Sequence, residues 1–437
     1  MSIFGQKVGR FPTGLEIIIT ALLVIAVNVL SYHFQNEITY NEGSGFDGVE
    51  YHKIAEDFAK GNTPTARAPF VYRVGTPFLA SIVSPDDILY GFRIVNITAG
   101  SLIPFALLFW LSLYFKNIYH RIIPVFLFAG AWHSPLRLSW FYPVHSDPVS
   151  VLLTLILLIV LYNIFSNSGN KKFSIILFSI LTFISVFVRE IGLIPALVFI
   201  LASISVSKRD NNLTKNKLLS YLPIIKFTDK SGLIPFLSGI AGIIIIRFLV
   251  ESSSSYSFVN SAFSWIYRKS LFMYLHSWLL AFGPVLFIVI YKWKYAYIYM
   301  KNNKLSAYFM ILIAILGLAG GSDTERLVYW SMPVVYIMIM RIASEFDVFK
   351  SKLIFWYLTV LQIINMRLFW ATPDYPNDFP SKISFLTPIG SDFPLLDLWT
   401  WHGDLKVNLI SFAGYIISFL VFAGIVHYTD KNSSKKL

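Results

Sequence analysis

The chain has 437 residues, of which 56% are hydrophobic and 17% aromatic, and its mean hydropathy is +0.63. These values exclude an ordinary soluble domain, and apolar runs of about 20 residues, each enough to cross about 30 Å of hydrocarbon, recur along the sequence. The net charge of +12 would suggest a nucleic-acid partner only if the distribution of the charge along the chain were ignored. The absence of cysteine excludes disulfides, thiol catalysis and thiolate metal sites.

The apolar runs predict an all-α transmembrane bundle of about twelve spans that forms a single domain over residues 1–437. The first run is too long for the core of a signal peptide and is followed by no small-residue cleavage site, so we interpret it as an uncleaved span. The predicted spans are 15–33, 88–115, 121–134, 148–165, 173–189, 191–207, 233–250, 277–293, 304–320, 328–343, 353–371 and 406–428.

The basic residues predict the orientation of these spans. With the N-terminus inside, the inner side holds 22 of the 36 basic and 6 of the 24 acidic residues, a net of +16 (22 − 6), and the outer side holds the other 14 and 18, a net of −4 (14 − 18). Positive charge collects in cytoplasmic loops, so we expect a multi-pass protein of the cell inner membrane with both termini cytoplasmic. The connections at 34–87, 135–147, 251–276 and 372–405 would then face outward, and residues 208–232 would form a basic cytoplasmic linker.

The first outer loop carries an amphipathic pattern. Tyr51, Ile54, Ala55 and Phe58 recur at helical spacing, which predicts a helix over Asp47–Lys60 lying in the membrane interface. A structural explanation of the acidic residues is a capping box, in which Asp47 caps the helix and Glu50 completes the motif.

Four polar clusters fall at the outer ends of the predicted spans. Each has a structural explanation of its own, as a helix cap, a hairpin cap or a local ion pair. Ionisable residues at a membrane boundary are costly to bury, however, and four clusters on one side predict one shared polar cavity. The clusters are Asp47 and Glu50 with Lys53, Arg67 and Arg73; His145-Ser146-Asp147-Pro148; Arg189-Glu190; and Ser322-Asp323-Thr324-Glu325-Arg326.

Asp47-Gly48, followed by Tyr51 and Ile54-Ala55, resembles the aromatic-Asp-Gly-x-x-Tyr-x-x-Ile-Ala stretch of GT-C superfamily glycosyltransferases, multi-spanning enzymes that use lipid-phosphate-linked sugars. The run from Tyr72-Arg73 to Ala80 resembles a Tyr-Arg-x-x-x-Pro-x-Leu-Ala run that often follows it in bacterial members. Asp323 and Arg326 are similar to an Asp-x-x-Arg pair in some of these proteins. Glu50 departs from the family, whose members commonly carry an amide or aromatic residue near that position.

The resemblance implies a GT-C-like fold and inverting transfer of a sugar from a polyprenyl-phosphate donor to a glycan, lipid or protein acceptor at the outer face of the membrane. Such a reaction needs a base for the acceptor hydroxyl, for which Asp47 is the candidate. It also needs cations for the departing phosphate, and an arginine matches phosphate oxygens with two parallel donors. The candidates for phosphate are Arg73, Arg189, Arg326 and His145, and Glu50, Tyr51, Asp147, Glu190 and Asp323 are the other expected substrate-site residues.

We expect no cofactor, because Asp47 alone matches the family position, although two neighbouring carboxylates at Asp47 and Glu50 would also suit a divalent cation. Nucleic acid is not an expected partner; the lipid-linked sugar, its acceptor and the bilayer are.

Two other classes of protein compete with the transferase. A transporter or flippase of lipid-linked saccharides predicts broken helices and internal repeats, and no repeat is visible, although Gly239, Gly242 and Pro284 lie within spans. A polymerase or ligase of lipid-linked glycans would place a catalytic loop at 372–405, a segment whose tryptophans favour an ordered lid. The helix in the first outer loop favours the transferase over both.

Overall fold

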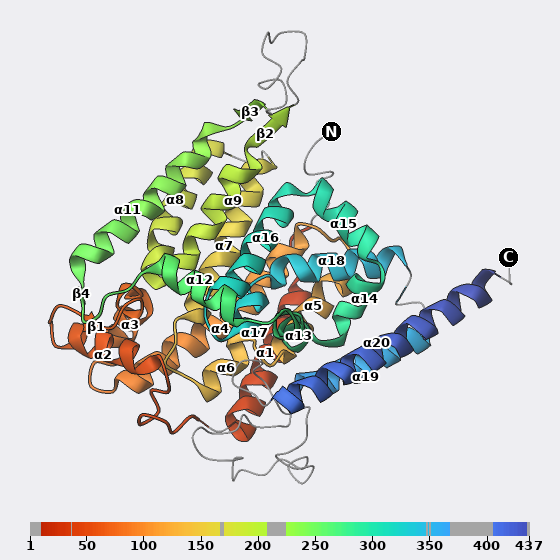
Figure 1. The fold of residues 1–437 in the computed structure, drawn as a ribbon, viewed down its shortest axis with the longest axis horizontal. Coiled ribbons are helices and arrows are strands. Elements are labelled where there is room, and N and C mark those ends of the chain that lie inside the picture. Colours follow the sequence, from red (N-terminus) through yellow and green to blue (C-terminus); the bar gives the residue numbers. More distant parts are fainter. Residues whose placement is uncertain are drawn as a thin grey trace.

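A computed structural model describes residues 10–35, 37–166, 170–207, 224–346, 348, 351–367 and 405–434. These residues form an all-helical fold, in which strands are confined to two small two-stranded sheets (Figure 1). The predicted outer segment 372–405 lies outside the described residues except for Leu405, and so does most of the predicted linker 208–232.

Seven helical segments of the described chain are long and apolar enough to cross a bilayer, as a membrane-embedded helical protein requires. One of them is Leu271–Tyr291, built from α13 (Leu271–Phe282), a 3₁₀ turn and α14 (Leu286–Tyr291). The others are α1 (Gly14–Phe34), α4 (Ile88–Ser112), α7 (Asp147–Phe165), α8 (Lys171–Val188), the segment Lys230–Leu249, which joins a 3₁₀ turn to α11 (Leu233–Leu249), and Asn408–Thr429 within α20 (Leu405–Ser434).

The remaining predicted spans coincide with helices that are too short to cross alone. At about 1.5 Å per residue they extend roughly 14 to 24 Å, which is less than about 30 Å of hydrocarbon. The number of spans therefore stays a prediction. These helices are α5 (Ile118–Gly130), α9 (Ile194–Ala202), α16 (Lys304–Ala319), α18 (Met332–Glu345) and α19 (Lys352–Met366).

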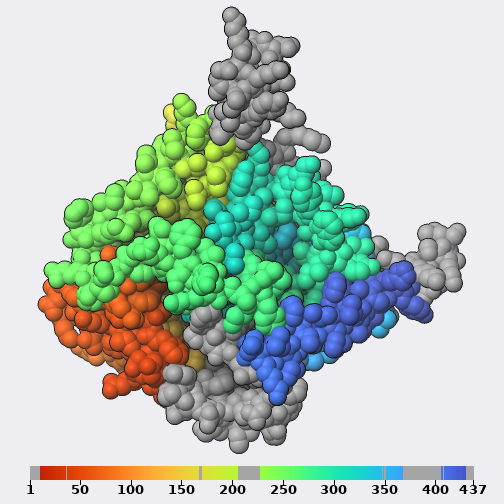
Figure 2. All heavy atoms as spheres, in the orientation of Figure 1, coloured from red at the N-terminus to blue at the C-terminus, as the bar shows by residue number. Residues whose placement is uncertain are grey.

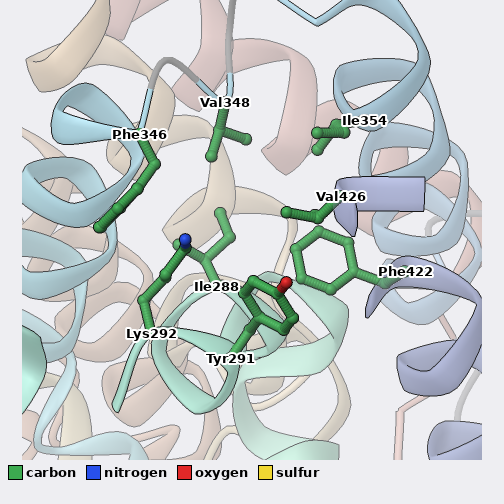
Figure 3. Close-up of a pocket in the computed structure, with 8 residues that line it drawn as sticks. All are labelled: Ile288, Tyr291, Lys292, Phe346, Val348, Ile354, Phe422 and Val426. Carbon is green, nitrogen blue, oxygen red and sulfur yellow. The ribbon is translucent and has the colours of Figure 1, made fainter. Parts of the chain in front are cut away.

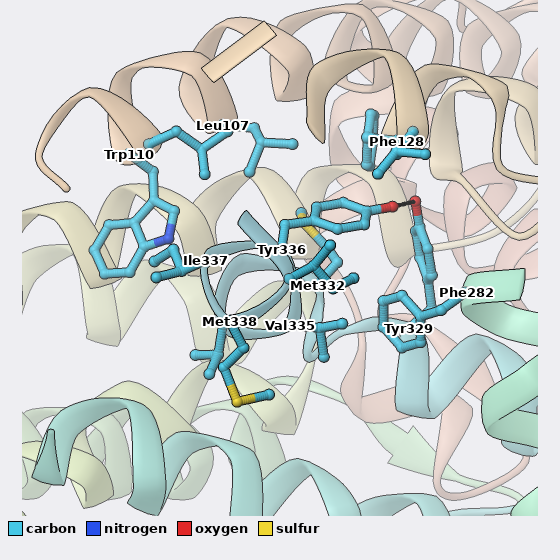
Figure 4. Close-up of a cluster of buried hydrophobic side chains, with 14 of the residues drawn as sticks. Leu107, Trp110, Phe128, Phe282, Tyr329, Met332, Val335, Tyr336, Ile337 and Met338 are labelled. Atoms are coloured by element: carbon cyan, nitrogen blue, oxygen red, sulfur yellow. Dashed lines mark hydrogen bonds between the residues drawn. The ribbon is translucent and has the colours of Figure 1, made fainter. Parts of the chain in front are cut away.

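The core is organised around α18, which is buried on almost every face. Leu107 and Trp110 of α4 and Phe128 of α5 pack against it (Figure 4), and the Trp110 indole donates a hydrogen bond to the Pro333 carbonyl at 2.9 Å. The Tyr336 hydroxyl bonds the Tyr329 hydroxyl at 3.1 Å. Other helices therefore enclose α18 within the described fold.

The segment 34–87, the predicted first outer loop, contains α2 (Gly48–Ala59), β1 (Thr65–Ala66) and α3 (Gly75–Val83). Helix α2 lies one residue inside the predicted range 47–60 at each end and buries Tyr51, Ile54 and Ala55, as its periodicity indicated. Gly61 follows it with φ +70°, a left-handed conformation that glycine adopts without strain at a helix end.

Strand β1 pairs in parallel with β4 (Glu251–Ser252), so the first loop lies against the segment after α11 (Figure 2). The antiparallel pair β2 (Ile204–Ser207) and β3 (Ile224–Phe227) joins the chain on either side of residues 208–223. Four short helices complete the described fold: α6 (Pro135–Phe141), α12 (Phe258–Arg268), α15 (Trp293–Asn302) and α17 (Thr324–Tyr329).

Candidate functional site

Three of the four predicted polar clusters meet in one buried chain of charges. Asp147 forms an ion pair with Arg189 through Oδ1, and its Oδ2 lies 3.0 Å from Arg326 Nε. Arg326 Nη2 in turn lies 2.8 Å from Asp323 Oδ2. These three clusters therefore meet, and the local pair of Asp323 and Arg326 is one part of a larger network, while the shared polar cavity at the outer face stays a prediction.

Helix ends bring these side chains together. Asp147 lies in the first turn of α7, where a carboxylate is favoured by the unpaired backbone N–H groups, and Pro148 suits that turn because it lacks an N–H. Arg189 follows the last residue of α8, and Arg326 lies in α17. The Arg189 guanidinium also lies 5.7 Å from the Trp330 ring centroid, which favours the cation.

Asp47 lies at the start of α2 and does not cap it. Its φ of −71° and ψ of −17° are helical, whereas a capping side chain usually needs an extended backbone, and its carboxylate makes no cap hydrogen bond. Both oxygens of Glu50 contact Arg67 instead, the backbone N–H at 2.8 Å and Nε at 3.4 Å. The capping-box interpretation is therefore wrong.

The Asp47 carboxylate is half-buried and forms no hydrogen bond or ion pair with any described residue. Burial raises the pKa of Asp47 above its usual value, and the charge of Asp323 raises it further, while Arg326, Arg73 and Arg189 act in the opposite direction. Charges of the buried chain, those of Asp323, Arg326 and Arg189, thus also act on Asp47. Its carboxylate nevertheless remains accessible and has no ion-pair partner among the described residues.

Two glycines allow the first loop to approach the other clusters. A Cβ on Gly48 would lie 2.8 Å from the Val144 carbonyl oxygen, and a Cβ on Gly75 would lie 3.0 Å from the Val188 backbone nitrogen. Gly48 therefore brings α2 against the segment that leads to Asp147, and Gly75 brings α3 against the residue before Arg189. Their close approaches give a physical reason for the glycines in the two motifs.

Arg73 holds the first loop to the end of α8. Its Nε and Nη2 donate to the Glu190 carboxylate at 3.0 and 2.9 Å, and its Nη1 donates to the Tyr51 hydroxyl at 2.8 Å. Every nitrogen of this guanidinium therefore already has a protein partner. In this conformation Arg73, Glu190 and Tyr51 form a clasp between elements, and their predicted contact with substrate stays a prediction.

His145 does not have the predicted role of a cation for phosphate. It is buried, and burial together with the charges of Arg326 and Arg189 holds its pKa well below the usual value, so the imidazole is neutral. Its Nε2 lies 3.3 Å from Ser139 Oγ, and its ring stacks on Tyr142. Both of these contacts are with uncharged side chains, those of Ser139 and Tyr142.

Two residues that the sequence analysis missed shape the site. The Asn96 amide, within α4, donates to the carbonyls of Pro143 and His145 at 2.7 and 2.8 Å and so holds the segment before Asp147. The Tyr142 hydroxyl accepts the Gly48 N–H at 2.7 Å and so holds the start of α2. A lone amide within an apolar span was the available signal for Asn96.

In the part of the chain that the structure describes, no group of three or more His, Asp or Glu side chains is arranged for a metal ion. The alternative of a cation shared by Asp47 and Glu50 would have to break the contacts of Glu50 with Arg67. Lys53 and Arg67 are exposed.

Comparison of the chain with family models, with curated proteins and with solved structures finds no match. The function must therefore be inferred from the chemistry of this site.

Proposed function

We propose that this protein is an integral membrane glycosyltransferase that moves a sugar from a polyprenyl-phosphate donor to an acceptor hydroxyl. The observation that carries the proposal is the unpaired carboxylate of Asp47 within the field of Arg189, Arg326 and Arg73. An accessible base beside buried guanidinium groups suits a reaction in which a hydroxyl loses a proton while a phosphate departs.

In the proposed reaction the acceptor oxygen attacks the anomeric carbon of the donor sugar, and the bond from that carbon to the phosphate oxygen breaks. The phosphate leaves with the bonding electrons, and Asp47 takes the proton of the acceptor hydroxyl. A raised pKa makes the Asp47 carboxylate a stronger base than an exposed aspartate. A single displacement inverts the anomeric configuration.

Arg326 is the candidate that contacts the departing phosphate. Its Nε and Nη2 are held by Asp147 and Asp323, whereas Nη1 has no partner among the described residues. The two carboxylates fix the plane of the guanidinium, so the remaining N–H groups are oriented before substrate binds. Preorganised donors of this kind stabilise developing charge without reorganisation.

The lipid-phosphate part of the proposal can be tested without knowing the sugar. Photoreactive farnesyl phosphate should label purified full-length protein in peptides that contain α2 or α17. Excess polyprenyl phosphate should remove this labelling, and excess polyprenol should not. Labelling that is spread over the lipid-facing helices, or that both competitors remove equally, would contradict the proposed donor.

A further inference from the structure

A second binding cleft lies between α14, the end of α18, α19 and α20, and shares no residue with the candidate site. It is a shallow cleft whose empty space of about 340 Å³ is partly open to solvent, and most of its lining is aliphatic or aromatic (Figure 3). Its lining residues are Ile288, Tyr291, Lys292, Phe346, Val348, Ile354, Phe422 and Val426.

Two polar groups lie among these apolar side chains. The Lys292 ammonium lies 3.9 Å from the centroid of the Phe346 ring and 5.1 Å from that of Tyr291, and it forms no ion pair with a described carboxylate. The Tyr291 hydroxyl has no hydrogen-bond partner among the described residues. Figure 3 shows both polar atoms within the ring of labelled side chains. Together they offer a positive charge and a hydroxyl donor at the wall of an apolar cleft.

The helix that follows the cleft has the composition of a membrane interface. Helix α15 bends by 114° away from α16, and its Trp293 and Tyr297 side chains are exposed. Residues 292–304 contain four lysines and no acidic residue. Exposed aromatic residues mixed with lysines are typical of segments that lie at the level of lipid headgroups, where they attract anionic lipids.

We propose that this cleft binds an anionic phospholipid of the surrounding bilayer. Part of one acyl chain would occupy the space beside Val426 and Ile288, and the phosphate would contact Lys292 and the Tyr291 hydroxyl. Charge complementarity selects an anionic lipid over a neutral one, and the apolar lining selects a lipid over a soluble phosphate. This inference stands apart from the proposed catalytic function, because it uses neither the catalytic residues nor an activity.

Native mass spectrometry of the delipidated full-length protein can test the headgroup contact, with phosphatidylglycerol and phosphatidylcholine as probes. Lys292→Gln should weaken phosphatidylglycerol binding about fivefold, the effect expected for losing one lysine near anionic lipid. Lys60→Gln removes an exposed lysine that directly follows α2 and should leave this binding unchanged. Equal binding of both lipids by wild type, or no change on Lys292→Gln, would overturn the proposal.

A second pair of variants tests the acyl chain. Val426→Trp should fill the cleft and abolish the bound phosphatidylglycerol, whereas Val421→Trp lies on the exposed part of α20 and should not. Inorganic phosphate should not compete with the lipid. Equal lipid binding by the two tryptophan variants, both eluting as the wild type does, or displacement by inorganic phosphate, would show that the cleft does not hold the chain.

Discussion

Asp147 and Arg326 form an ion pair, with 3.0 Å between Oδ2 and Nε, although one opens the long helix α7 and the other lies in the six-residue helix α17. Their side chains are only 3% and 13% exposed. The pair therefore ties two distant parts of the chain together, and the charge of Arg326 also acts on Asp47.

Asp147→Asn should destabilise the protein, because it leaves Arg189 and Arg326 buried with less compensating charge. Removing one partner of a buried pair typically costs about 3–5 kcal/mol. Thermal unfolding in detergent should show a clear fall in the midpoint. Glu56→Gln, which removes an exposed carboxylate of α2, should change stability by no more than about 0.5 kcal/mol. Equal midpoints for the two variants would exclude a stabilising role for Asp147.

Arg326→Lys should weaken use of the donor although the charge is kept. A lysine cannot bridge Asp147 and Asp323 while it also presents an oriented donor to phosphate. We expect reduced labelling by photoreactive farnesyl phosphate. Arg93→Lys is the matched control, because Arg93 pairs with Glu37 in a more exposed position. Unchanged labelling of the Arg326 variant would remove Arg326 from the phosphate site.

Asp47→Asn should lower the rate of glycosyl transfer by about 10²–10⁴-fold, the usual contribution of a general base. The amide cannot accept the proton of the acceptor hydroxyl. Complementation of a deletion strain, with protein levels measured by immunoblot, is the first readout. Glu50→Gln should have a smaller effect, since an amide oxygen can still accept the Arg67 N–H. Full activity of the Asp47 variant would show that another residue is the base.

The same residue predicts a pH dependence. Its folded-state pKa is raised above 3.8, so ionisation of Asp47 costs stability as pH rises through the folded pKa. Asp47→Asn should therefore gain thermal stability relative to wild type at about pH 7, and this gain should shrink towards about pH 4. The kcat/KM of wild type should rise with pH over the same range. A variant less stable than wild type at neutral pH would contradict the raised pKa.

The charge asymmetry predicts the topology. Alkaline phosphatase fused after residues 40, 260 and 385 should be active outside the cytoplasm, and fusions after residues 170, 215 and 437 should be inactive. The matched inner fusions serve as controls for expression. Activity of the fusion after residue 215 would reverse the proposed orientation and remove the candidate site from the outer face.

The sequence by itself was enough to predict the all-helical fold, the presence of α2 to within one residue at each end, and the residues of the buried charge network. These features depend on periodicity and composition, which are local, and on the rule that ionisable groups at a membrane boundary need partners. Asp147, Arg189, Asp323 and Arg326 could therefore be selected before their contacts were known.

Only the tertiary structure decided which partner each charge takes. Glu50 contacts Arg67 instead of capping α2, and Arg73 forms an ion pair with Glu190. His145 is neutral because it is buried and because the charges of Arg326 and Arg189 lower its pKa. A side chain's partner and charge depend on groups that packing brings close from elsewhere in the chain, and on how far packing excludes water. Neither is encoded in the local spacing of residues, so the unpaired Asp47 carboxylate became visible only once the helices were assembled.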